Sequence, residues 1–170
     1  DSEFKFAGVN PCAEEPLPAG GSCLLGAINL AAFVVNGRFD FDDFADTVAR
    51  AVKALNEVLD EGLELHPLEE QRESVADWRQ IGLGIFGLAD MLIKMGMEYG
   101  SADSIVLCDR IGFIMADTAI GASAYLARDK KPYNKFKPEA LDKNLYFIEN
   151  TREETKRAVK RFGLRNSQLL

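Results

Sequence analysis

The spacing of apolar positions is helical over most of the chain. From residue 41 onwards, apolar side chains recur every three or four positions, which places them on one face of a helix. The series is Phe41, Phe44, Val48, Val52, Leu55 and Leu59. Asp40 precedes it as a candidate N-cap, and acidic residues follow near the positive end of the helix. The pattern predicts a helix over 40–62 in which Gly62 forms a left-handed cap.

Three further stretches are predicted to be helical, and they are 68–96, 101–129 and 151–162. The first contains Gly82, Gly84 and Gly87, which weaken a helix and therefore indicate close packing against another backbone. The second begins at Ser101, a good N-cap, and presents one apolar face. The third begins at Thr151, which has the spacing of a capping box.

Residues 1–30 lack helical spacing. The segment Val9–Pro18 contains three prolines, which favour an extended or looping backbone. Alternate side chains of an extended segment share a face, so Asn10, Cys12 and Glu14 are expected to point the same way. A glycine pair follows, and it predicts a turn before a short strand or a buried loop.

Composition is that of a soluble globular chain. The 170 residues, 47% of them hydrophobic and 28% charged, suffice for one core and indicate a single domain over 1–170. With the spacing described above, the expected fold class is α/β and predominantly helical. The net charge of −7 opposes binding to a nucleic-acid backbone, although a local site could still take a free nucleotide. No apolar run is long enough for a membrane span and no signal-peptide pattern is present, so a cytoplasmic location is expected.

The two ends of the sequence suggest an excised piece. The chain has no initiator Met, and it stops at Leu170, just as an apolar run begins. Natural domains more often end in a polar tail. We therefore expect the chain to be part of a longer polypeptide.

Cysteine supplies the candidate chemistry. Cys12 lies in the proline-rich segment two residues before Glu14, and such a thiol can act as a nucleophile, a redox centre or a radical carrier. The alternative is a small buried hydrophobic residue. His66 is the sole histidine and precedes a proline, which disfavours a catalytic triad. Without a Cys-x-x-Cys pair a zinc site is disfavoured too, and no metal site is expected.

Four segments resemble one enzyme family. Residues 10–14, Asn-Pro-Cys-Ala-Glu, and residues 22–30, Ser-Cys-Leu-Leu-Gly-Ala-Ile-Asn-Leu, resemble the finger-loop motif of the catalytic chain of ribonucleotide reductases. Residues 79–90 and 163–167 resemble later landmarks of that family, in the family's order. Ala13 departs from the pattern, because the family commonly has glycine there, and Leu24 replaces a common asparagine.

The resemblance implies a role for each residue of the loop. Cys12 would carry the thiyl radical that takes the 3′ hydrogen of the substrate ribose, and Glu14 would be the base on the 3′ hydroxyl. Asn10 would hold substrate hydroxyls in position. Cys23 would be half of a redox-active dithiol whose other cysteine is absent from this chain. The substrate would lie against Asn10, Pro11, Cys12, Ala13, Glu14 and Ser22.

The resemblance also implies a setting for the loop. The fold would be a partial piece of the family's ten-stranded α/β barrel, with residues 1–30 as the finger loop and its flank. The full enzyme would make deoxyribonucleotides for DNA synthesis from ribonucleoside di- or triphosphates, with a thioredoxin-like reductant. The Glu15-Pro16 form of the loop is closer to the adenosylcobalamin-dependent class than to the class with a diiron subunit. We expect no cofactor on this piece alone, and no catalysis without the remainder of the reductase chain.

Two other functions fit parts of the sequence. Gly82, Gly84 and Gly87 satisfy the Gly-x-Gly-x-x-Gly fingerprint of dinucleotide-binding domains, but the residues before them do not have a strand pattern and no suitably placed acid follows. Alternatively, the piece could be a non-catalytic binding or interaction module that retains the loop as inert structure. Cys108 lies at helical spacing among apolar residues and is expected to be a core thiol.

Overall fold

The computed structural model describes residues 3–169, so the last residue of the C-terminal apolar run lies outside the described part. The strands are β1 (Phe6–Val9), β2 (Pro16–Pro18), β3 (Leu24–Asn29), β4 (Val34–Val35), β5 (Arg38–Phe39) and β6 (Ile81–Phe86). The α-helices are α1 (Phe41–Gly62), α2 (Glu69–Trp78), α3 (Leu88–Met95), α4 (Ala102–Lys130), α5 (Leu145–Glu149) and α6 (Glu153–Phe162). Short 3-10 helices are η1 (Leu30–Phe33), η2 (Leu63–Leu65) and η3 (Pro138–Ala140). The fold class is therefore α/β and predominantly helical, as the sequence predicts.

A parallel pair of strands, β3 and β6, is the centre of the fold. Leu24 lies opposite Ile81 and Asn29 lies opposite Phe86, with no break in register between them. The C-terminal segment follows the other edge of β6, because the backbone N–H of Leu83 donates a hydrogen bond to the carbonyl oxygen of Leu169 (2.9 Å). Among residues 3–169, the sheet that contains β3 and β6 is open.

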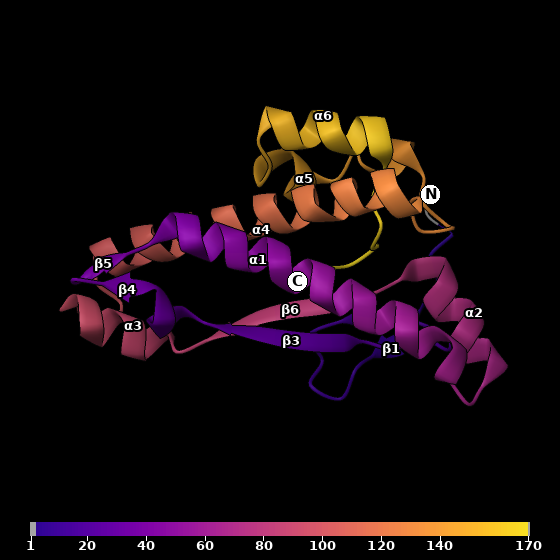
Figure 1. Ribbon diagram of the computed structural model, residues 1–170, viewed down its shortest axis with the longest axis horizontal. Helices are drawn as coiled ribbons and strands as arrows, with labels where there is room; N and C mark the ends of the chain where they lie inside the picture. The colour runs from indigo at the N-terminus through magenta and orange to yellow at the C-terminus, as the bar shows by residue number, and fades with distance from the viewer. Residues whose placement is uncertain (1–2, 170) are drawn as a thin grey trace.

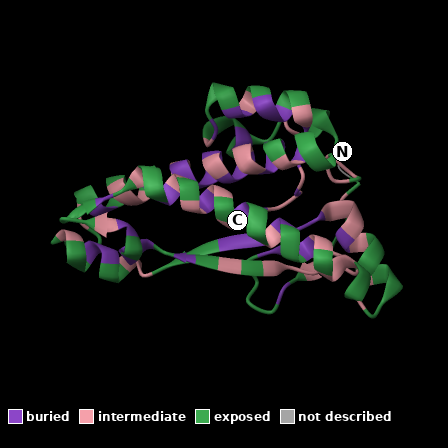
Figure 2. Ribbon diagram, viewed as in Figure 1, coloured by how far each residue is buried: buried purple, intermediate pink, exposed green. Residues whose placement is uncertain are grey.

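Helices cover one face of this strand pair. Figure 1 shows α1 and α4 running side by side above β3 and β6, with α6 against the far side of α4. The buried positions of α1 recur along one side of the helix (Figure 2), as its apolar spacing predicts. The two long helices therefore shield one face of the sheet, while Leu25, Ala27 and Phe86 on the opposite face are exposed.

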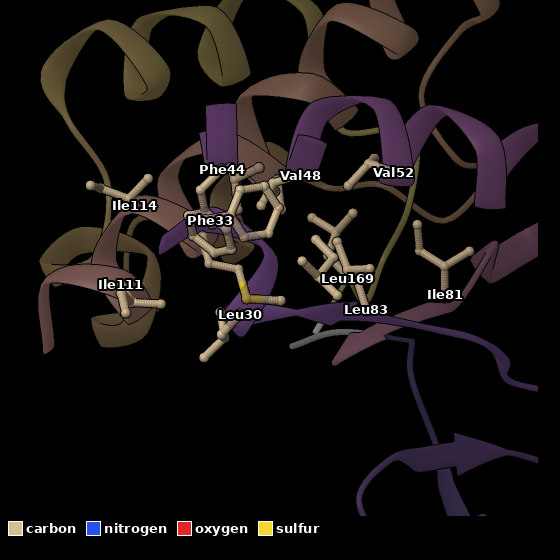
Figure 3. Packing of buried hydrophobic residues seen from close by; sticks show 14 of the residues in the cluster. Leu30, Phe33, Phe44, Val48, Val52, Ile81, Leu83, Ile111, Ile114 and Leu169 are labelled. Atoms are coloured by element: carbon tan, nitrogen blue, oxygen red, sulfur yellow. The ribbon is translucent and has the colours of Figure 1, made fainter. Parts of the chain in front are cut away.

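The core lies between α1, the 3-10 turn η1 and the covered face of the sheet. Phe44 and Leu30 have no exposed surface, and the rings of Phe33 and Phe44 meet edge to face at 5.4 Å between centroids. Val52 of α1 lies above Ile81 and Leu83 of β6 (Figure 3). Burial of these apolar side chains fixes α1 on the strand pair.

The two long helices lie where the sequence predicts them, and hydrogen bonds at their N-termini explain where they begin. The side chain of Asp40 accepts hydrogen bonds from the backbone N–H groups of Asp42 and Asp43, both at 3.1 Å, so it is the N-cap of α1. Ser101 caps α4 in the same way through the N–H of Ser104. Gly62 differs from the prediction, because its φ is −72° and the chain continues into η2 without a left-handed cap.

The prediction of a continuous helix over 68–96 is wrong. The chain leaves α2 at Arg79, which has a left-handed φ of 50°, and then forms strand β6 over Ile81–Phe86 before α3 begins. The expected close packing is present, because a Cβ on Gly82 would lie 2.6 Å from the Leu25 side chain of the neighbouring strand. Gly82 therefore allows close packing between two strands and not against a helix.

The last helix also begins later than predicted. The residue before α6 is Arg152, which makes no side-chain cap, while the hydroxyl of Thr151 donates to the carbonyl oxygen of Phe147. The backbone N–H of Arg152 instead donates to the Asp117 carboxylate of α4 (2.8 Å). A contact between two helices therefore replaces the local capping box.

A cluster of ion pairs joins distant parts of the chain at Asp60 of α1. The carboxylate pairs with Arg79, with Lys130 at the end of α4 (2.8 Å) and with Arg165 (3.3 Å). Arg79 is 4% exposed and also donates to the Asn56 side-chain oxygen at 2.9 Å. Burial raises the pKa of Asp60, but the bonds from Lys130 and Arg79 outweigh it and hold that pKa below its ordinary value.

Among residues 3–169, no helix is both long enough and apolar enough to cross a membrane.

Candidate functional site

The proline-rich segment forms the turn of a β-hairpin. β1 and β2 are antiparallel, with Val9 opposite Pro16, and residues 10–15 connect them. The backbone N–H of Asn10 donates to the carbonyl oxygen of Glu15 (3.2 Å), and the N–H of Glu15 donates to Asn10 Oδ1 (2.9 Å). These two bonds close the base of the turn and leave Cys12 at its exposed tip.

The prediction that Asn10, Cys12 and Glu14 share one face is wrong. The segment turns instead of extending, because the N–H of Ala13 donates back to the carbonyl oxygen of Asn10 (2.9 Å) and Ala13 has a φ of 64°. As a result Asn10 is buried, while Cys12 and Glu14 are exposed. Local proline preference indicated an extended chain, and hydrogen bonds across the turn override it.

Two glutamines hold the hairpin against the rest of the fold. The carbonyl oxygen of Pro16 accepts hydrogen bonds from the side-chain amides of Gln80 (3.2 Å) and Gln168 (3.0 Å), and these two amides also bond to each other. Gln80 directly precedes β6, and Gln168 lies in the segment along the edge of β6. The position of the loop therefore depends on residues more than 60 positions away in the sequence.

The C-terminal segment 163–167 holds the start of β6 in place. Asn166 is fully buried, and its side-chain amide donates to the carbonyl oxygen of Arg79 (3.0 Å) while its Oδ1 accepts from the hydroxyl of Ser123 in α4 (3.1 Å). The N–H of Ser167 donates to the carbonyl oxygen of Trp78 (3.0 Å). This segment therefore fixes the entry into β6, the strand that faces the loop.

A cavity of about 530 Å³ lies between the loop and the strand pair. Its lining comes from two glutamates of the loop and from the first halves of the two strands, namely Glu14, Glu15, Leu25, Gly26, Ala27, Gly82, Leu83 and Gly84. The glycines and Ala27 add little side-chain bulk, and Leu25 and Leu83 make the wall apolar. The loop therefore presents acidic groups to a hollow with an otherwise apolar wall.

Cys23 lies at the start of β3, on the side of the loop. It is partly buried, and a Cβ on Gly82 would lie 3.2 Å from its Sγ. Burial, together with the neighbouring Glu15 carboxyl group, raises the pKa of the Cys23 thiol to about 12. At neutral pH the group is therefore a protonated thiol.

The structure brings together part of the predicted site and separates the rest. Glu14 lines the cavity, and Pro11 and Cys12 lie at the exposed tip of the same turn but are not among the lining residues, whereas the carbonyl oxygen and Oδ1 of Asn10 both accept hydrogen bonds that close the turn. Ser22 is half-buried and directly precedes Cys23.

Sequence reasoning missed Glu15 as a site residue. Its side chain is 2% exposed, and its carboxyl group lines the cavity beside Cys23. Nothing in the local sequence distinguishes it from Glu14, because the burial of one and exposure of the other come from the turn geometry.

The geometry also bears on two other expectations from the sequence, a dinucleotide-binding fingerprint and a core thiol. Gly82 and Gly84 lie within strand β6 and not in a turn between a strand and a helix, and the Leu25 side chain fills the space above Gly82. A dinucleotide fingerprint needs that turn for the pyrophosphate. The expectation that Cys108 is a core thiol is only partly met, because this residue of α4 is partly buried and lines a separate pocket with Leu88 and Leu92 of α3.

Comparison with known families gives a match over most of the chain. The family model described as "Ribonucleotide reductase, barrel domain" matches residues 5–170. The match includes the hairpin, the strand pair, the long helices and the C-terminal segment.

Individual relatives agree with this match. A vitamin B12-dependent ribonucleoside-diphosphate reductase of Thermoplasma acidophilum is 38% identical over 123 residues, which cover 72% of this chain and 16% of that protein. One of Mycobacterium tuberculosis is 35% identical over 132 residues, 78% of this chain and 19% of that protein. A ribonucleoside-diphosphate reductase large subunit of African swine fever virus is 32% identical over 135 residues, 79% of this chain and 17% of that protein. The chain thus spans between a sixth and a fifth of these relatives' length.

Proposed function

The chain belongs to the barrel-domain family of ribonucleotide reductases, and from this premise we propose that it is the finger-loop portion of a catalytic chain that reduces ribonucleotides to deoxyribonucleotides for DNA synthesis. The observation that carries the proposal is the position of Cys12. Its thiol lies exposed at the tip of a hydrogen-bonded turn, two residues before Glu14, which lines the cavity between the loop and the strand pair.

The proposed reaction assigns one task to each group. Cys12, as a thiyl radical, takes the hydrogen atom from the 3′ carbon of the ribose, and the weak S–H bond makes the transfer reversible. Glu14 takes the proton of the 3′ hydroxyl. The 2′ hydroxyl then leaves as water, while Cys23 and a second cysteine outside this chain supply two electrons and two hydrogens and become a disulfide. Cys12 finally returns the hydrogen atom to the 3′ carbon, and Glu14 returns its proton to the 3′ oxygen.

The remaining loop residues would orient the sugar. Asn10 holds the turn closed with its Oδ1, so its amide nitrogen is the group we assign to the substrate hydroxyls. Pro11, Ala13 and Ser22 would form the rest of the contact surface. The substrate would be a ribonucleoside di- or triphosphate, and the phosphate-binding residues are expected in the remainder of the reductase chain.

Adenosylcobalamin is the radical source that we favour for the full enzyme. Two of the relatives above are named as vitamin B12-dependent, and the Glu15-Pro16 form of the loop agrees with that class. When bound, this cofactor would supply the radical that is passed to Cys12, and the exposed thiol suits transfer from a group outside this chain. The residues that would hold the cofactor are expected outside this piece. The proposal also includes a thioredoxin-like reductant and a cytoplasmic location.

The test uses the full-length chain that contains residues 1–170. Purified chain is given a ribonucleotide, adenosylcobalamin and a small dithiol, and deoxyribonucleotide is measured by chromatography with each component omitted in turn. We expect product only when all components are present. Product that requires a diiron subunit instead of cobalamin would contradict the cofactor assignment, and no product under either condition would contradict the proposed reaction.

The role of Cys23 has a separate readout. A pre-reduced full-length chain without external dithiol should make about one product per chain, and Cys23→Ser should make none because the internal reductant is lost. A binding or interaction module, which is the alternative function, would show unchanged ligand binding and no turnover in either form.

A further inference from the structure

Glu15 is a buried carboxyl group without a well-formed partner. Its side chain is 2% exposed, and neither carboxyl oxygen has a hydrogen-bond partner of ordinary geometry among residues 3–169. The backbone of Glu15 is fixed on both sides, by the N–H bond to Asn10 Oδ1 and by the carbonyl that accepts from Asn10. A buried carboxylate in this situation is costly, so the group requires a proton or a partner that shares one.

The neighbouring side chain is the thiol of Cys23. A Cβ on Gly82 would lie 2.6 Å from the Leu25 side chain, 3.2 Å from Cys23 Sγ and 3.7 Å from Glu15 Oε1, so the thiol and the carboxyl group both lie over this glycine, beside Leu25. A side chain at Gly82 would collide with Leu25, so the glycine leaves room for all three groups. Glu15 reaches this place because the turn directs it inwards while Glu14 stays exposed.

Among residues 3–169, the charged side chain that acts on the Glu15 carboxyl group is Glu14. Cys23 is the other group that acts on it, and β6 contributes the uncharged Gly82. Burial raises the pKa of Glu15, and the neighbouring Glu14 charge acts in the same direction. The pair therefore tends to retain protons.

We propose that Glu15 is the proton partner of Cys23, a positioning residue that keeps this thiol protonated and exchanges a proton with its sulfur. The pairing of Glu15 with Cys23 is inferred from their positions in the structure, whereas the use of this pair in turnover rests on the proposed function. The role differs from that of Glu14, which we assign to the substrate hydroxyl.

In turnover the exchange would act when the disulfide of Cys23 is reduced. A thiolate of an external dithiol attacks the second cysteine of the disulfide, forms a new S–S bond with it, and expels Cys23 as a thiolate. The Glu15 carboxyl gives its proton to Cys23 Sγ and becomes a carboxylate. The second thiol of the reductant then releases the mixed disulfide, so two electrons pass from the dithiol to the cysteine pair. A proton from solvent restores Glu15.

The test measures the pH dependence of Cys23 alkylation in the full-length reduced chain. Iodoacetamide reacts with the thiolate, and peptide mass spectrometry reports Cys23 and Cys12 separately. Glu15→Gln removes the charge but keeps a similar shape, so the Cys23 profile should move to lower pH. A fall of about one in the pKa of Cys23 raises the fraction of thiolate about tenfold. Because a thiolate of lower pKa is also a weaker nucleophile, the alkylation rate rises only about threefold. Glu14→Gln is the matched control and should move the profile less.

The outcomes distinguish the charge of Glu15 from its structural role. Glu15→Asp keeps a carboxyl group, so its Cys23 profile should stay closer to wild type than that of Glu15→Gln, with the Cys12 rate unchanged in both. An unchanged Cys23 profile in Glu15→Gln would overturn the proposal, and so would equal acceleration in the Asp and Gln variants. Because alkylation needs no substrate or cofactor, a failed turnover assay leaves this result standing.

Discussion

Asn10 and Glu15 close the turn that carries Cys12, and this pair determines what each loop residue can do. The bonds between them bury both side chains and leave the four residues from Pro11 to Glu14 at the surface. The motif that contains Cys12 could be identified from the sequence, because residue types and spacing are local properties. The burial of Glu15 could not, because it follows from a turn that proline preferences alone do not predict.

Ala13 is strained at the tip of this turn. Its φ of 64° lies in the left-handed region, which costs a residue with a Cβ about 1–2 kcal/mol. Ala13→Gly removes that strain but adds unfolded-state entropy worth about 0.5–1 kcal/mol. The free energy of unfolding from denaturant titration should therefore rise by about 0.5–1 kcal/mol.

The same substitution in β1 provides the control. Ala7 is exposed and lies in a strand with an ordinary negative φ, so Ala7→Gly should destabilise the chain by about 0.5–1 kcal/mol. Equal losses in both variants would show that residue 13 does not hold the left-handed conformation.

At the scale of elements, the long helices follow from local pattern and the strand pair does not. The apolar spacing and the caps at Asp40 and Ser101 define α1 and α4 within the sequence. Strand β6 is a six-residue apolar run with two glycines, and its parallel partner β3 lies more than 50 residues earlier. Such a run cannot be assigned by periodicity, because its partner decides whether it becomes strand or helix.

The ion cluster at Asp60 links these elements and gives a pH-dependent prediction. Asp60→Asn leaves the buried Arg79 without its carboxylate, which should cost about 2–3 kcal/mol at pH 7, somewhat less than a fully buried pair because Asp60 is 29% exposed. The folded-state pKa of Asp60 is lowered, so its contribution is present above the unfolded value near 3.8 and is lost as pH falls through the folded value. The variant and wild type should therefore converge in stability only in strong acid.

Urea unfolding at pH 7 and near pH 3 checks this expectation. Glu57→Gln is the matched control, because Glu57 is 54% exposed and pairs with Lys53 at 3.8 Å on the surface of α1. It should change stability by less than about 0.5 kcal/mol. A loss as small as this in Asp60→Asn would mean that the cluster does not stabilise the fold.

At the scale of the whole molecule, the chain is a helical layer on a small open sheet. One sheet face is covered by α1, while Leu25 and Phe86 on the other face are more than half exposed, at 56% and 54%. The family match places this sheet in a barrel. The spacing of apolar residues indicated the fold class, but the arrangement of loop, cavity and C-terminal segment depends on contacts between residues far apart in the sequence.

Residues 1–170 alone should be catalytically silent. The chain has three cysteines, and we assign no second redox role to Cys12 or Cys108, so Cys23 lacks its partner. The cavity beside the loop is open to solvent on the exposed face of the sheet, which leaves a radical unprotected. Assay of the piece with adenosylcobalamin, ribonucleotide and dithiol should give no deoxyribonucleotide above background, with the full-length chain as positive control. Robust conversion by the piece would contradict this expectation.

The most direct measurement compares deoxyribonucleotide formation by the full-length chain with Cys12→Ser and with Cys108→Ser. Both variants replace one thiol by a hydroxyl, but Cys12 lies at the tip of the loop whose glutamates line the cavity, and Cys108 lies in α4 at a separate pocket. Cys12→Ser should abolish turnover while binding of the nucleotide persists, because a hydroxyl O–H bond is too strong for reversible hydrogen transfer, and Cys108→Ser should retain most of the activity. Turnover that survives in Cys12→Ser would contradict the assignment of Cys12 as the radical carrier.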